Sequence, residues 1–166
     1  MKNILPVLQA LQAVEQAVTY HIYGPVIDAA YWQQCRNAIA ALPSHIRVTY
    51  HGHLHPSRLE AALQKGQVFI LPSKSENFGH ALYEALAAGR PVITSHGTPW
   101  NGVDAAAAGK NLDPQNGAAI SDAIRFFAAM DEPEIKRWSA AARTYAQNRI
   151  NREKIREQYH RMFGLT

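Results

Sequence analysis

The sequence predicts an α/β protein built on a doubly wound parallel sheet with helices on both faces. Segments rich in β-branched and aromatic residues alternate with segments whose apolar residues recur at helical spacing. One strand segment, 67–72 (QVFILP), is almost wholly apolar, which is typical of a strand covered on both faces. Strands that alternate with helices join in parallel through right-handed crossovers, which gives the open doubly wound sheet.

The first half of the chain supplies three helices and two strands. Ile4, Leu5, Leu8 and Leu11 have helical spacing, Pro43 closes the second helix, and Ser57 is the expected N-cap of the third. The segments VTYHIYG and IRVTYHG have strand composition and each ends in glycine. The expected elements are a helix within 1–18, a strand at 18–24, a helix at 28–43, a strand at 46–52 and a helix at 57–66.

The second half continues the alternation and then becomes helical. Asp113-Pro114 marks the last turn before the helical end, and breaks are expected at Pro133 and near Ile150. The expected elements are strand 67–72, helix 79–88, strand 90–94, helix 101–108, a short extended piece at 111–112, and helices 118–130, 134–148 and 151–162.

Composition indicates one globular domain, or a part of a larger protein. The chain has 166 residues, 47% of them hydrophobic and 18% charged, which is enough apolar material for a sizeable core. The single cysteine, Cys35, excludes an internal disulfide, and no secretory signal pattern precedes the first helix. No apolar run approaches the roughly 18 residues that span a bilayer. We therefore expect a cytoplasmic domain.

The net charge of +4 is concentrated near the end of the chain, where eight basic residues lie within 136–161. Arg149 with Glu153, and Glu157 with Arg161, have the i,i+4 spacing of helical ion pairs. This pattern favours a solvated helix face over contact with a membrane surface or a partner domain. Nucleic acid is disfavoured as a partner, because no recognition motif accompanies the charge.

Several chemistries have no signature in the sequence. No G-x-G-x-x-G follows a strand, and the chain contains neither a P-loop nor a G-x-S-x-G nucleophile elbow. Cys35 lies in the middle of a predicted helix and is interpreted as a packed thiol. Ligands of doubly wound sheets bind beyond the carboxyl ends of the strands, so we expect chemistry in loops 51–56, 72–78 and 95–101.

The HGHLH segment spaces three histidines by two residues. In extended backbone His51, His53 and His55 would share one face, which could hold Zn²⁺. Gly52 and Pro56 favour a loop instead of a rigid strand. We therefore favour a polar or ligand-lining loop over a metal site and expect no metal.

The segment SENFGHALYEALAAG, 75–89, places Glu76 and Glu84 on either side of a helix start. Free N–H groups and the positive end of the helix dipole bind anions there, and Gly79 allows close approach of a phosphate. Carboxylates accept hydrogen bonds from neutral hydroxyls, so Glu76 and Glu84 together with a phosphate site fit a nucleotide sugar. The alternative is that Glu76 caps the helix while Glu84 faces solvent.

The stretch from Val68 to Ser95 resembles the signature of retaining GT-B glycosyltransferases of family 4, the group 1 type. It resembles their C-terminal, nucleotide-sugar-binding domain, with the E-x7-E motif at Glu76 and Glu84, and a looser resemblance extends from Met1 to about Tyr159. The resemblance implies a Rossmann-like fold, the C-terminal half of GT-B. It also implies hexosyl transfer from a nucleoside diphosphate sugar with retention, without cofactor or metal, in bacterial cell-surface polysaccharide or lipopolysaccharide synthesis.

The resemblance also implies roles for individual residues. Glu76 would be catalytic and hold hydroxyls of the transferred sugar, and Glu84 would hold the ribose hydroxyls. Backbone N–H groups in the segment between them would bind the sugar and diphosphate, and the Gly52 loop would line the base. The implied substrate-binding residues are Lys2, Gly52, His53, Leu54, Glu76, Asn77, Phe78, Gly79, His80 and Glu84.

The sequence departs from the family pattern in three places. Relatives carry an Arg and a Lys after the first strand of this domain; Lys2 matches the Lys, while the Arg and its strand have no counterpart. Trp100 stands where many relatives have an acidic residue, and would either contact ligand or the N-terminal domain, or belong to the core. His80 replaces a small or aliphatic residue, which bears on donor preference.

These departures predict that 1–166 is a single donor-binding domain, a fragment lacking the N-terminal acceptor domain and its own first strand. One sheet edge would then be unpaired, and the isolated domain would be inactive or nearly so. A peripheral location of the full enzyme at the cytoplasmic membrane face is the alternative to a purely cytoplasmic one. The alternatives are a non-catalytic nucleotide-binding or interaction module of flavodoxin-like shape, and a GT-B sugar-nucleotide epimerase or phosphorylase.

Overall fold

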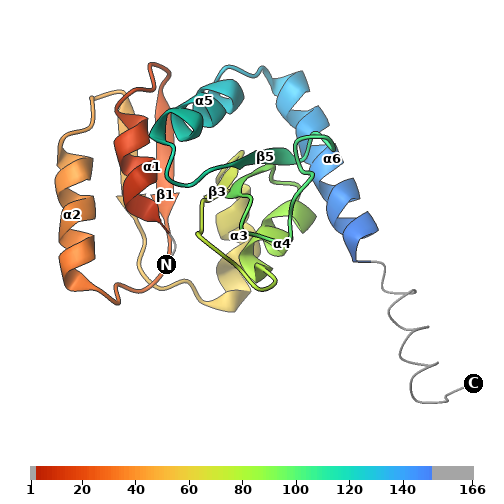
Figure 1. Cartoon of the computed structure of the whole chain (residues 1–166), viewed down its shortest axis with the longest axis horizontal. Coiled ribbons are helices and arrows are strands. Elements are labelled where there is room, and N and C mark those ends of the chain that lie inside the picture. Colours follow the sequence, from red (N-terminus) through yellow and green to blue (C-terminus); the bar gives the residue numbers. More distant parts are fainter. Residues whose placement is uncertain (1–2, 151–166) are drawn as a thin grey trace, which may run out of the picture.

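The computed structural model describes residues 3–150, which form five parallel strands and six α-helices (Figure 1). The strands are β1 (Val18–Ile22), β2 (Ile46–Tyr50), β3 (Phe69–Leu71), β4 (Val92–Ser95) and β5 (Gly109–Leu112). The helices are α1 (Ile4–Leu11), α2 (Ala29–Ala40), α3 (Leu59–Gln64), α4 (His80–Ala87), α5 (Gly117–Ala128) and α6 (Glu132–Arg149), with a short 3₁₀ helix, η1 (Pro56–Arg58), before α3.

The strands form two hydrogen-bonded ladders instead of one continuous sheet. β1 pairs with β2, and β3, β4 and β5 pair in that order, all in parallel. The predicted α/β class with parallel strands is confirmed. The break falls between β1 and β3, which face each other without pairing and line two cavities of about 380 and 210 Å³.

Two hydrophobic cores lie on opposite faces of the strands. Residues of α1, α2 and α5 form the first core with Ile93 of β4, and residues of α4 and α6 form the second with Val92 of β4. Ile93 and Val92 are neighbours, so β4 supplies alternate side chains to the two faces. The burial on both faces that the sequence predicted for strand 67–72 is only partial in β3, where Leu71 alone is buried, whereas all four residues of β4 are buried.

Helix α5 connects the two ladders across the break. It follows β5 in the chain and packs on α1, which precedes β1 (Figure 1). Ser121 Oγ donates to the carbonyl of Ala10 at 2.9 Å, and Arg125 Nη1 donates to the carbonyl of Ala13 at 3.2 Å. These contacts join segments that are more than a hundred residues apart in sequence.

Helix starts follow their expected cap chemistry where a short polar side chain is available. Asp28 accepts from Tyr31 N, Asn116 accepts from Ala119 N, and Asp131 and Glu134 form a capping box. Ser57 is not the cap that the sequence predicted. The His55 imidazole accepts from Ser57 N instead, η1 intervenes, and α3 begins at Leu59.

The predicted helix at 101–108 is also wrong, because this segment is a series of turns. Gly102 and Ala107 have φ of 92° and 51°, which a right-handed helix does not accommodate. The Asp104 carboxylate accepts from Asn111 N at 2.6 Å, so it holds the segment against β5.

The predicted helix 151–162 and the ion pairs of Glu153 and Glu157 lie outside the described residues. Among the helices of residues 3–150, none combines the length and apolar character needed to cross a membrane.

Candidate functional site

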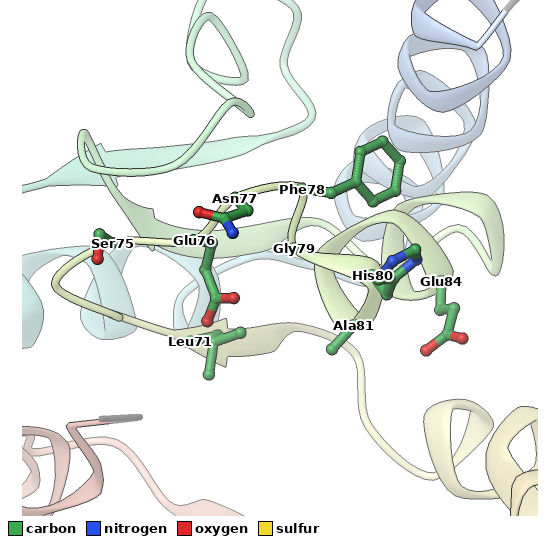
Figure 2. Close-up of a pocket in the computed structure, with 9 residues that line it drawn as sticks. All are labelled: Leu71, Ser75, Glu76, Asn77, Phe78, Gly79, His80, Ala81 and Glu84. Carbon is green, nitrogen blue, oxygen red and sulfur yellow. The ribbon is translucent and has the colours of Figure 1, made fainter.

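A cavity of about 710 Å³ opens at the carboxyl edge of β3, in the loop that leads into α4 (Figure 2). All parallel strands end at this edge, which is where ligands of doubly wound sheets bind. Six of the predicted site residues line the cavity, namely Glu76, Asn77, Phe78, Gly79, His80 and Glu84. The lining residues are Leu71, Ser75, Glu76, Asn77, Phe78, Gly79, His80, Ala81 and Glu84.

The start of α4 presents backbone donors to this cavity. Gly79 is the N-cap residue, with φ 74° and ψ 57°, and no side chain caps the helix. Within residues 3–150, no acceptor is found for the backbone N–H groups of Phe78, His80 and Ala81, or for that of Gly79. Unpaired N–H groups at a helix start, with the positive end of the helix dipole, are chemically suited to an anion.

Glu76 is oriented by neighbours on two loops. Its Oε1 accepts a hydrogen bond from Ser73 Oγ at 2.7 Å, and its backbone N–H donates to the carbonyl of Gly97 at 3.1 Å. Ser73 is only 1% exposed, and its own carbonyl accepts from Ser95 Oγ. The carboxylate therefore does not cap α4, and one of its oxygens is available to a ligand.

Glu84 lies about one turn into α4 and is exposed to solvent. Figure 2 shows the carboxylates of Glu76 and Glu84 extending in the same direction, on either side of Ala81, while the Phe78 ring points the other way. Neither carboxylate forms an ion pair with a described residue. Two acceptor groups therefore border the cavity beside a set of backbone donors.

The loop after β2 borders a second cavity, not the first. His53 and Leu54 line the cavity of about 380 Å³ between β1 and β3, which shares Leu71 and Ala81 with the cavity at α4. Gly52 has φ 71°, and its carbonyl accepts from Gly24 N at 2.8 Å. The two predicted ligand loops thus border adjoining cavities.

The three histidines of this loop do not converge. His51 Nε2 lies 3.0 Å from His21 Nδ1 and its ring stacks on Tyr23, whereas His55 contacts Ser57. Burial, followed by the neighbouring His51 and Lys65, lowers the pKa of His21. No group of three or more metal-ligating side chains occurs in the described part of the chain.

Trp100 belongs to the core. It is 1% exposed, and its Nε1 donates to the carbonyl of Phe78 at 2.5 Å. The alternative of a ligand-stacking surface is therefore excluded for its ring. Cys35 is also fully buried, as predicted.

Sequence reasoning missed Ser73 and Gly97 as residues that support the site. A Cβ on Gly97 would stand 2.2 Å from the carbonyl oxygen of Lys74, so only glycine lets the two loops approach. The one available signal was the position of both residues just after predicted strands. Lys2 lies outside the described residues.

Comparison with known proteins identifies the family. The model of the family "Glycosyl transferases group 1" matches residues 1–145. Glycogen synthase of Mycobacterium tuberculosis is 35% identical over 83 residues, which cover 49% of this chain and 20% of that protein. A probable sucrose-phosphate synthase of Oryza sativa subsp. japonica is 37% identical over 109 residues, which cover 65% of this chain and 10% of that protein.

A solved structure shows the same fold. Anabaena HepE, determined in complex with UDP and glucose, matches with a TM-score of 0.80 and 18% identity over 99% of this chain and 45% of that one. The chain thus spans a small part of the curated relatives and under half of this structure. The match of its family model over most of the chain shows that the protein belongs to the group 1 glycosyltransferases, whose known structures include GT-B folds.

Proposed function

We propose that this domain binds the nucleoside diphosphate sugar of a retaining glycosyltransferase. The carrying observation is the start of α4, where unpaired N–H groups adjoin two carboxylates in one cavity. A diphosphate needs donors, and the sugars at its two ends need acceptors. Support for a uridine nucleotide comes from HepE, whose structure contains UDP and glucose.

The backbone donors would act on the leaving group. As the bond from the sugar to the diphosphate breaks, negative charge grows on the diphosphate. N–H groups of Phe78, Gly79 and His80 that are fixed before the reaction stabilise this charge without reorganising. In the proposed same-face reaction, the acceptor oxygen bonds to the sugar carbon and its proton passes to the departing diphosphate.

The two glutamates would position the ends of the donor. Glu84, exposed on α4, accepts from the ribose hydroxyls, and Glu76 accepts from hydroxyls of the transferred sugar through the oxygen that Ser73 does not engage. Asn77 lies beside Glu76, and His53 and Leu54 would line the base from the adjoining cavity, with Gly52 forming the turn that precedes them. Acceptors in cell-surface polysaccharide or lipopolysaccharide synthesis form part of this proposal.

We also propose that this is the donor half of a two-domain enzyme whose sheet is completed by one more strand. Within residues 3–150 no strand pairs with the facing edges of β1 and β3, and cavities lie between them. Asn3, the residue before α1, donates from Nδ2 to the carbonyl of Pro72, just after β3. A parallel strand preceding Asn3 would fill the gap and give the order of a doubly wound sheet, with the new strand at its centre.

Calorimetric titration with UDP, GDP and ADP at low ionic strength tests the donor site. We expect one diphosphate to bind and Glu84→Ala to weaken it by about 10-fold, as for the loss of a hydrogen bond to a charged group. Glu60→Ala, which removes an exposed glutamate from α3, is the matched control and should bind as the unmodified chain does.

The same titration is repeated on a protein extended at its N-terminus. Binding only by the longer protein would support the donor site and the missing strand together. If no diphosphate binds to either protein, the donor-site proposal is wrong, and a non-catalytic interaction module becomes the better interpretation.

A further inference from the structure

The buried indole of Trp100 contacts the loop that carries the proposed diphosphate site from behind. Its Nε1 donates to the carbonyl of Phe78, the residue just before Gly79. A Cβ added to Gly79 would lie 3.3 Å from the same nitrogen, so the indole lies directly against the loop. The ring itself is inaccessible to a ligand, because only 1% of the residue is exposed.

The indole is held in place by its surroundings on several sides. Its ring lies against those of Tyr83 of α4, Phe78 and Tyr145 of α6, with centroid distances of 6.0, 5.6 and 6.3 Å. The Trp100 carbonyl accepts from Asn111 Nδ2 at 3.2 Å, and Tyr145 Oη donates to the next carbonyl, that of Asn101, at 2.7 Å. The donor nitrogen of Trp100 therefore has a fixed position relative to the loop.

The hydrogen bond fixes the peptide between Phe78 and Gly79. In a planar trans peptide the C=O and the N–H point in opposite directions. Because the Phe78 oxygen is held toward the indole, the Gly79 N–H is directed away from the buried core. Phe78 and Gly79 both line the cavity, so this N–H is a donor on its side.

The conformational freedom of Gly79 is the reason that the hydrogen bond from Trp100 matters for the orientation of this peptide. Gly79 has φ 74°, and glycine occupies positive and negative φ with similar ease, so this peptide can rotate at low cost. A rotated peptide would present the Phe78 oxygen to the cavity, where it would repel a phosphate. A residue without a donor at position 100 would leave both orientations populated.

We propose that Trp100 is a positioning residue for diphosphate binding, which sets the orientation of the Phe78–Gly79 peptide through its indole N–H. This inference rests on the proposed donor site, since it assigns the Gly79 N–H to the diphosphate. It predicts an effect that depends on the number of phosphates, because base and ribose contacts do not involve this peptide.

The test compares UDP with UMP, or the corresponding pair of whichever nucleotide binds, for Trp100→Phe. Phenylalanine keeps a ring but has no N–H. We expect the Kd for the diphosphate to rise by about 10-fold and that for the monophosphate by less than about 3-fold. Trp138→Phe, in the separate aromatic cluster with Phe126 and Phe127, is the matched control and should change neither. Equal losses for both nucleotides, or no loss, would overturn the proposal.

A ligand-free measurement separates this inference from the donor site. In ¹H–¹⁵N spectra the Trp100 indole proton should exchange slowly, and Trp100→Phe should shift or double the Gly79 amide signal. A fast indole exchange or an unchanged Gly79 signal would overturn the proposal even if diphosphate binding were established. If the phenylalanine variant does not fold, 3-benzothienylalanine at position 100 keeps the bicyclic shape and replaces the N–H with sulfur.

Discussion

The two ligand loops at the carboxyl edge differ in how they are held. Loop 72–79 is tied to its neighbours by buried groups: Ser73 is 1% exposed, Trp100 donates to Phe78, and Glu76 N donates to Gly97. Loop 51–55 is mainly exposed, and its histidines contact His21 and Ser57 near the surface. The fixed loop carries the backbone donors of the proposed diphosphate site, whereas the exposed loop borders the cavity of the proposed base site.

The largest effect is expected from Gly97→Ala, which removes the close approach that holds the first loop. The new Cβ would meet the Lys74 carbonyl at 2.2 Å, and a backbone atom cannot rotate away. We expect a loss of about 3 kcal/mol in the free energy of unfolding and of most diphosphate binding, as in overpacked sites. Urea unfolding and calorimetry measure the two effects.

Gly117→Ala is the control for that substitution, because nothing lies within 4 Å of its added Cβ. It should leave binding unchanged and keep the stability within about 1 kcal/mol. Equal stability and equal diphosphate binding of Gly97→Ala and Gly117→Ala would show that neither property depends on the close contact between the two loops.

A smaller effect is expected from Ser73→Ala, which leaves Glu76 Oε1 without its protein donor. Hydrogen bonds to charged groups contribute about 1.5–3 kcal/mol, so the Glu76 carboxylate should lose its fixed orientation. The affinity for a nucleotide sugar should fall by about 10-fold more than that for the nucleotide alone. Ser44→Ala, an exposed serine beyond α2, is the control; equal losses for both ligands would contradict the role of Ser73.

In the exposed loop, Gly52→Ala tests the effect of a positive φ on stability without a steric clash of the added Cβ. The φ of 71° disfavours alanine, yet nothing lies within 4 Å of the added Cβ. We expect a cost of about 1–2 kcal/mol in unfolding free energy, with the diphosphate contacts of loop 72–79 retained. Urea denaturation measures the cost in unfolding free energy, and UDP titration measures the binding. A larger cost, or a loss of UDP binding, would mean that this loop is as constrained as loop 72–79.

The smallest effect is a pH dependence that arises from His21. Burial, His51 and Lys65 lower its pKa from the usual value of about 6.5, so the unfolded chain binds protons more readily than the folded one. Stability should therefore be constant above that value and decrease as the pH falls below it. Urea unfolding at pH 7.5 and 5.5 should show this decrease, with a smaller decrease in His21→Gln than in His96→Gln, an exposed histidine outside the pair.

Local signals in the sequence predicted much of the fold. Helical spacing and the positions of prolines placed α2 and α6 to within about three residues: the sequence predicted 28–43 and 134–148, and the structure has Ala29–Ala40 and Glu132–Arg149. Pro133, the expected break, lies in the first turn of α6, where proline is tolerated. The position of Glu76 before α4 and of Glu84 within it was likewise predicted, because both follow from the start of one helix.

The features that could not be predicted depend on contacts between distant residues. The turns at 101–108 depend on Asp104 holding Asn111, and the glycine-only approach at Gly97 depends on Lys74 in another loop. The Trp100 hydrogen bond spans 22 residues to Phe78. Composition alone favoured a helix in the first case and left the role of Trp100 open in the last.

Helix α5 has a consequence for the order in which the domain folds during synthesis. Its bonds to Ala10 and Ala13 span 111 and 112 residues, so the first half must leave the ribosome and wait before α5 exists to cover α1. Pairings at such separation form late, and the exposed apolar surface is prone to aggregation in the interval. We therefore expect nascent chains that end before Gly117 to be the species that most needs a chaperone.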